Sequence, residues 1–99
     1  MTVFVVAALN FTDEARYRMY QARFAQVFAG SGGRLLAADE APRLLEGSAQ
    51  VDKVVLMQFA SEAAARAFLE SPAYQEISAD RRAGAQTTAL LVRGLDPAT

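Results

Sequence analysis

The sequence predicts one α+β domain in which helices cover one face of a four-stranded antiparallel sheet. Apolar runs rich in β-branched residues occur at residues 2–9, 53–60 and 87–92, as expected of strands buried on both faces. Amphipathic helical segments lie between them, and 99 residues leave no room for a second domain. We expect residues 1–94 to form the domain and residues 95–99 a C-terminal tail.

The first half of the chain is predicted as strand, helix and strand. After the strand at 2–9, Thr12 is expected to cap a helix that runs to the glycine-rich stop at 30–33. Residues 34–38 form the second strand. The loop that follows is expected to contain a short extended piece at 43–45.

The second half repeats this pattern. Residues 53–60 form a strand, and Ser61 caps the helix that follows. The Ser71–Pro72 pair ends that helix and begins a further helical segment, which reaches about residue 83. With the last strand at 87–92, the order is β-α-β-β-α-β, the ferredoxin-like arrangement.

This arrangement leaves one face of the sheet without helices. Because the strands are apolar on consecutive residues, a monomer would expose several Val, Leu, Met or Phe side chains. Burying each of them stabilises an assembly by roughly 2 kcal/mol at about 25 cal/mol per Å². We therefore predict a homodimer that forms through the sheet face opposite the helices.

The composition excludes several classes of function. The chain has no His, Cys or Trp, which excludes His-based triads, thiolate metal sites and His-ligated haem, and we expect no cofactor or metal. A net charge of −1 with scattered arginines argues against a nucleic-acid partner. The apolar N-terminal run is too short to span a membrane and lacks a basic leader, so we expect a cytoplasmic protein.

Two tyrosines on the first predicted helix are candidate ligand-binding residues. Tyr17 and Tyr20 share its apolar face, where two phenols could hydrogen-bond the carbonyl or phenolate oxygen of a ligand. The alternative, which we favour, is that both are core aromatics with satisfied hydroxyls.

Three further candidates lie later in the chain. Gln58 on the third strand is either a pocket donor and acceptor or, as we favour, a satisfied polar residue at the rim. Tyr74 and Arg81 share one face of the last helical segment. Arg81 either binds an anionic substrate or pairs with a carboxylate such as Asp13 or Glu46, and we predict the ion pair.

A set of short motifs extends over nearly the whole chain. They are Asp13 followed by Tyr17 and Tyr20, Gly32–Gly33–Arg34, Leu45–Glu46–Gly47, Phe59, Ser71–Pro72–Ala73–Tyr74–Gln75, Arg81 and Val92–Arg93–Gly94. Together they resemble the family named domain of unknown function 1330, of the dimeric α/β-barrel superfamily. The resemblance implies a ferredoxin-like protomer, a partner sheet that completes a two-sheet barrel, and a cleft between sheet and helices in each subunit. It implies no assigned reaction.

The sequence departs from the family pattern at three places. Gln58 replaces a usual Glu, Phe68 replaces a usual Trp, and Ala38–Asp39–Glu40 replaces Arg-Gly-Gly. The missing carboxylate at position 58 argues against a general base there. The superfamily includes cofactor-independent monooxygenases, lactone isomerases and haem enzymes, but extending their activities to this chain is an analogy of fold.

The sequence therefore predicts a homodimer that binds a small molecule. One hypothesis is a cofactor-independent enzyme acting on a small aromatic or keto compound, with Tyr17 and Tyr20 orienting the substrate and Arg81 stabilising negative charge. The other is a non-catalytic ligand-binding or stress-associated dimer, in which these residues hold the helices onto the sheet.

Overall fold

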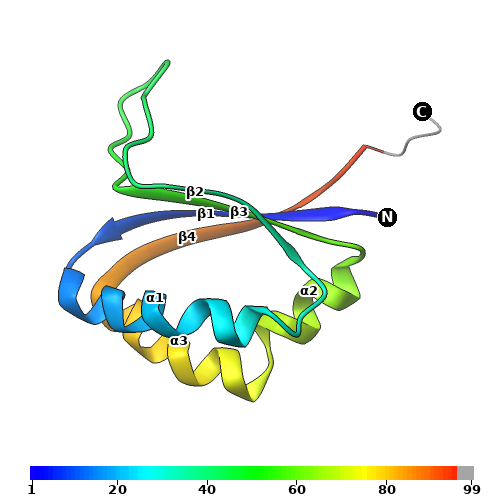
Figure 1. The fold of residues 1–99 in the computed structure, drawn as a ribbon. Helices are drawn as coiled ribbons and strands as arrows, with labels where there is room; N and C mark the ends of the chain where they lie inside the picture. The colour runs from blue at the N-terminus through cyan, green and yellow to red at the C-terminus, as the bar shows by residue number, and fades with distance from the viewer. Residues whose placement is uncertain (96–99) are drawn as a thin grey trace.

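The computed structural model describes residues 1–95, which form four strands and three helices. These are β1 (Val3–Phe11), α1 (Glu14–Phe28), β2 (Arg34–Asp39), β3 (Lys53–Phe59), α2 (Glu62–Leu69), α3 (Pro72–Gly84) and β4 (Ala85–Arg93). The strands form one antiparallel sheet in the order β2-β3-β1-β4, and all three helices lie on one side of it (Figure 1). The predicted α+β, ferredoxin-like fold is thus confirmed.

Two local predictions are wrong. Asp13, not Thr12, caps α1, because the Asp13 carboxylate accepts a hydrogen bond from the Arg16 N–H at 3.3 Å. The extended piece predicted at 43–45 is part of an irregular loop between β2 and β3, which projects beyond the sheet (Figure 1). Of the predicted C-terminal tail, residues 96–99 lie outside the described residues.

Helices α1 and α3 touch at the backbone. The carbonyl of Gly84 accepts hydrogen bonds from the N–H groups of Thr12 and Asp13 at 2.9 and 3.1 Å. A Cβ atom at Gly84 would overlap the backbone nitrogen of Tyr17, so the close approach requires a residue without a side chain. This contact fixes the start of α1 against the end of α3.

The two faces of the sheet differ in their cover. The helix-facing side chains of Val3, Val5, Leu9, Met57 and Phe59, on β1 and β3, are almost fully buried, whereas Ala89 of the edge strand β4 faces the same way and is exposed. The opposite side, here called the open face, carries Phe4, Val6, Ala8, Val54, Leu56, Leu90 and Val92. Within residues 1–95 no helix covers it (Figure 1).

The space between the helices and the sheet is filled unevenly. At one end, aromatic rings pack against one another, with ring centroids 4.6 to 6.5 Å apart among Phe24, Phe28, Phe59, Phe68 and Tyr74. Toward the other end the sheet contributes alanines at Ala7 and Ala89. The tightly packed end anchors the helices, and the other end leaves room for a cavity.

Candidate functional site

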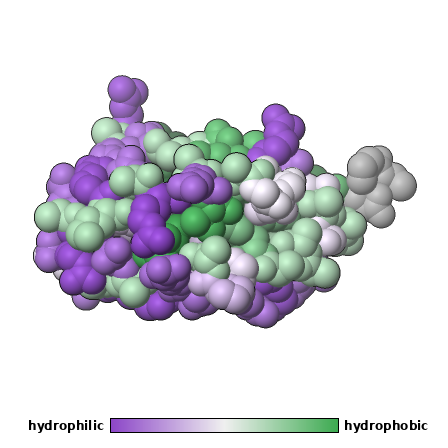
Figure 2. All heavy atoms as spheres, turned by 60° about the horizontal axis from the view of Figure 1, so that its bottom comes forward, coloured by the Kyte–Doolittle hydropathy of each residue, from purple (hydrophilic) through white to green (hydrophobic). Residues whose placement is uncertain are grey.

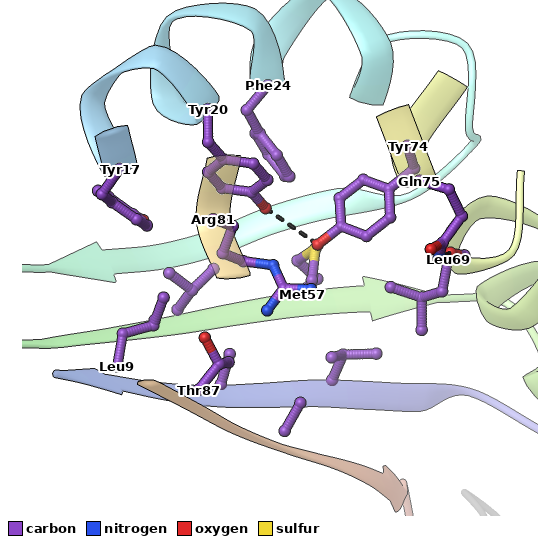
Figure 3. Close-up of a pocket in the computed structure, with 14 residues that line it drawn as sticks. Leu9, Tyr17, Tyr20, Phe24, Met57, Leu69, Tyr74, Gln75, Arg81 and Thr87 are labelled. Carbon is purple, nitrogen blue, oxygen red and sulfur yellow. Dashed lines mark hydrogen bonds between the residues drawn. The ribbon is translucent and has the colours of Figure 1, made fainter. Parts of the chain in front are cut away.

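A cavity of about 180 Å³ lies between the helix layer and the sheet. Its roof carries Tyr17, Tyr20 and Phe24 from α1, with Tyr74 and Arg81 from α3 (Figure 3). Its floor is mostly apolar and consists of β-strand side chains, of which Met57, Leu9 and Thr87 are labelled in Figure 3. An apolar space with a few converging polar groups is typical of a small-molecule site.

The cavity follows from two alanines at matched positions. Ala7 of β1 and Ala89 of β4 are register partners and both line the cavity, and Val55 of β3 lies opposite Ala7 on its other side. Because directly opposed residues in an antiparallel pair point to the same face, the two methyl groups lie side by side. Because these side chains are small, space remains between the sheet and the helices at this point.

The hydroxyls of Tyr20 and Tyr74 meet at the roof of the cavity. Their oxygens are 3.0 Å apart and both residues are buried, so one phenol donates to the other (Figure 3). Burial, and then the neighbouring Tyr74, raises the pKa of the Tyr20 phenol far above its ordinary value. Tyr20 therefore remains protonated at neutral pH. One O–H of the pair is left to donate to a third group.

Arg81 enters the cavity from α3 without an ionic partner among residues 1–95. Its guanidinium carbon lies 5.9 Å from the centroid of the Tyr20 ring, and its Nε is buried without a hydrogen-bond partner. The predicted ion pair is wrong for the described residues. The carboxylate that precedes it, Asp80, pairs with Arg16 at 2.8 Å, and Asp13 caps α1.

Thr87 is a site residue that the sequence prediction missed. Its hydroxyl is buried without a hydrogen-bond partner among residues 1–95, and it faces the helix layer from β4, across the cavity from Arg81 (Figure 3). The sequence carries only part of this signal: Thr87 shares the parity of Ala89 on the last strand, but the register of the sheet is needed to show that this parity faces the helices.

The structure brings together Tyr17, Tyr20, Tyr74 and Arg81, but not Gln58. Gln58 is the register partner of Phe4 and points to the open face, away from the cavity. Its neighbours in sequence, Met57 and Phe59, point to the helices and are buried. Because strand residues alternate, Gln58 cannot share their face.

A second chamber of about 210 Å³ lies between α1 and the strands β2 and β3. It shares Tyr17, Tyr20, Phe24 and Val55 with the first cavity, so these side chains form a common wall. Lys53, which is only 4% exposed, lines this chamber with its Nζ 5.0 Å from the centroid of the Tyr17 ring.

An acidic residue at the end of β2 compensates the charge of Lys53. The Oε2 atom of Glu40 lies 3.4 Å from Lys53 Nζ and 2.6 Å from Arg18 Nη1, so Glu40 forms ion pairs with both cations. The hydrogen bonds from Arg18 and then from Lys53 lower the pKa of Glu40 to about 2. The cation of the second chamber is therefore already paired, unlike Arg81.

Seen from the side that bears the helices, strongly hydrophobic residues are visible in a hollow bordered by hydrophilic ones (Figure 2). Among residues 1–95, no three acidic side chains come together as a metal site. None of the helices in that range is both long and apolar enough to cross a membrane.

The sequence model of the family described as domain of unknown function (DUF1330) matches residues 2–95. The chain belongs to the DUF1330 family. The resemblance inferred from its motifs is thereby confirmed. No match was found among curated proteins.

Solved structures with the same fold as this DUF1330 chain include a protein of unknown function from Rhodopseudomonas palustris, with a TM-score of 0.81 and 18% identity over 97% of this chain and 84% of that one. A cofactor-independent oxygenase from Streptomyces nogalater, SnoaB, matches with a TM-score of 0.67 and 20% identity over 96% and 94% of the two chains. A dimeric ferredoxin-like protein of unknown function from Thermobifida fusca matches with a TM-score of 0.68 and 14% identity over 95% and 92%. At these identities the likeness concerns the fold.

Proposed function

We propose that this DUF1330 protein is a homodimer that binds a small, largely apolar molecule in the cavity beneath Tyr20, Tyr74 and Arg81. The observation that carries the proposal is the convergence of these polar groups on an apolar space of about 180 Å³. Apolar cavities of about 150 Å³ take up benzene, so this cavity has room for one six-membered ring with a short substituent.

Access to the cavity is supported by an adjoining hollow at the edge of the sheet. The hollow is lined by Arg66 and Glu70 at the end of α2 and by Leu90 of β4. It shares Val5, Leu69 and Ala89 with the cavity, so the two spaces are adjacent. A ligand would enter between the end of α2 and the edge strand β4.

The dimer part of the proposal is supported by the open face. Leu90 and Val92 are 59% and 42% exposed there, and Leu56 and Val6 lie between them and β2. A second copy brings the same apolar surface and can cover it with two-fold symmetry. The dimeric protein from Thermobifida fusca has the same fold.

An enzyme is the second candidate. The observation that favours it is the set of hydrogen-bond donors at the cavity roof, which would stabilise an oxyanion that develops on a small aromatic or keto substrate. The fold is shared with a cofactor-independent oxygenase. In the non-catalytic or stress-associated alternative, the same cavity holds its ligand unchanged, so product formation separates the two.

The binding proposal is tested by filling the cavity. Ala89→Leu places a larger side chain on the cavity floor, whereas Ala22→Leu makes the same change at a position of α1 that does not line the cavity. In NMR titrations with single-ring compounds such as benzyl alcohol and benzoate, we expect Ala89→Leu to weaken binding about tenfold or more and Ala22→Leu to leave it unchanged. Equal binding by all three proteins would refute the site.

A further inference from the structure

We infer that the ligand of this cavity carries an acidic group, and that the guanidinium of Arg81 binds this group together with the hydroxyl of Thr87 and the Tyr20–Tyr74 pair. The inference deepens the proposed function and rests on it. It assigns the chemical class of the ligand: a ring-sized, mostly apolar molecule with one carboxylate or similarly delocalised anion.

The first argument is an inventory of donors and acceptors. The Arg81 side chain has only donors, and within residues 1–95 its buried Nε has no hydrogen-bond partner. In the same described range the buried Thr87 hydroxyl also has no partner, and the Tyr20–Tyr74 pair has one O–H left to donate. No Asp or Glu lines the cavity within residues 1–95. A lining rich in unused donors is complementary to a ligand group that only accepts.

The second argument is charge. An arginine is protonated at any physiological pH, and a buried donor without a partner destabilises the protein that contains it. The acids of α3 do not compensate Arg81, because Asp80 pairs with Arg16 at 2.8 Å and Glu76 with Arg23 at 3.7 Å. The positive charge at the cavity is therefore available to a ligand.

The third argument is placement. The guanidinium of Arg81 lies between the paired tyrosine hydroxyls on the roof and Thr87 on the floor (Figure 3). A planar carboxylate matches the fork of a guanidinium with two parallel hydrogen bonds. With its acid group held there, the ring of the ligand would lie over Ala7 and Ala89, toward the hollow at β4.

The test compares a charged probe with a neutral probe of the same shape. Benzoate and benzamide are titrated into the 99-residue protein at fixed protein concentration, and binding is followed by NMR. We expect the dissociation constant of benzoate to be lower than that of benzamide by about tenfold or more, because only benzoate offers two charged acceptor oxygens to Arg81. We expect Arg81→Gln to abolish this preference. Arg82→Gln, which removes the same charge at an exposed neighbour, should preserve it.

Each other result overturns a specific step. Benzamide binding as tightly as benzoate refutes the acidic ligand but leaves the proposed cavity. A preference that persists in Arg81→Gln refutes the role of Arg81. If Arg81→Gln does not fold, Thr87→Val replaces it, and an undiminished preference in that variant counts against the site. If neither probe binds wild-type protein and Ala89→Leu behaves like wild type with other single-ring compounds, the proposed function fails as well.

Discussion

The two faces of the sheet differ in how well their side chains are covered. Val5 and Phe59 on the helix face are 3% and 1% exposed, whereas Leu90 and Val92 on the open face are 59% and 42% exposed. The chain itself closes the helix face, and we propose that a second copy closes the open face. The comparison teaches that substitutions of opposite parity on one strand can separate the stability of the protomer from its assembly.

The largest effect is expected on the helix face. Phe59 packs against Phe28 and Phe68 with centroid separations of 6.1 and 5.9 Å. Phe59→Ala would leave a cavity in this cluster and should lower the free energy of unfolding by about 3 to 5 kcal/mol. Chemical denaturation at fixed protein concentration measures it. A loss below about 1 kcal/mol would show that the cluster does not anchor the helices.

For substitutions on the open face, we expect dimer formation to weaken while the protomer stays folded. Leu56→Asp would bring two carboxylates into the proposed interface and should raise the dimer dissociation constant by about a hundredfold, or about 3 kcal/mol. Sedimentation velocity at micromolar concentration should show a folded monomer, while Gln26→Asp, on an exposed position of α1, should remain dimeric. A variant that stays dimeric, or a monomeric wild type, would contradict the proposed interface.

A smaller effect on the free energy of unfolding is expected at Arg81, which differs from Arg16 in lacking an ionic partner within residues 1–95. The partner of Arg16 is Asp80. The ion pair predicted from the sequence would make Arg81→Met destabilising. The structure instead predicts unchanged stability or a gain of up to about 1 kcal/mol, because a buried donor without a partner is removed. Denaturation in ligand-free buffer gives the sign, and a clear loss would point to an ionic partner for Arg81.

The smallest effect concerns Glu40, which links the β2–β3 loop to α1. Its folded pKa of about 2 lies below the ordinary value of 4.5, so its contribution to stability is present above pH 4.5 and is lost as the pH falls toward 2. Because Glu40 and Arg18 are each 38% exposed, solvent screening keeps this contribution below about 1 kcal/mol.

Glu40→Gln tests this pH dependence. The difference in unfolding free energy between wild type and variant should be largest at neutral pH and approach zero near pH 2. A difference that does not change with pH would show that the carboxylate is not stabilised by Arg18 and Lys53.

The order of the strands and helices could be predicted from the sequence because hydrophobic periodicity is a local property of the chain. The same holds for Tyr17 and Tyr20 on one side of α1 and for Tyr74 and Arg81 on one side of α3. Helical phase does not specify how two helices are rotated against each other. For this reason the sequence does not show that Arg16 of α1 meets Asp80 of α3, nor that Arg81 has no ion pair with Asp13 or Glu46 among residues 1–95.

Strand residues of the site were harder to predict for another reason. Both faces of β1 and β3 are apolar, so the pattern does not show which parity points to the helices. The sequence pattern therefore includes Gln58 among the candidate site residues, although it lies on the open face. The same pattern does not indicate Thr87, although it lines the cavity. Only the register of the sheet decides between these two assignments.

The backbone contact at Gly84 has a consequence for the thermodynamics of binding. Since Gly84 is hydrogen-bonded to both Thr12 and Asp13, α1 and α3 are joined near the cavity before any ligand arrives. The tyrosine hydroxyls come one from each helix, and the Gly84 contact at one end and the aromatic packing around Tyr74 at the other hold the two helices together. The conformational entropy lost in placing these donors side by side is therefore lost when the protein folds, not when a ligand binds. A ligand would find a preorganised site.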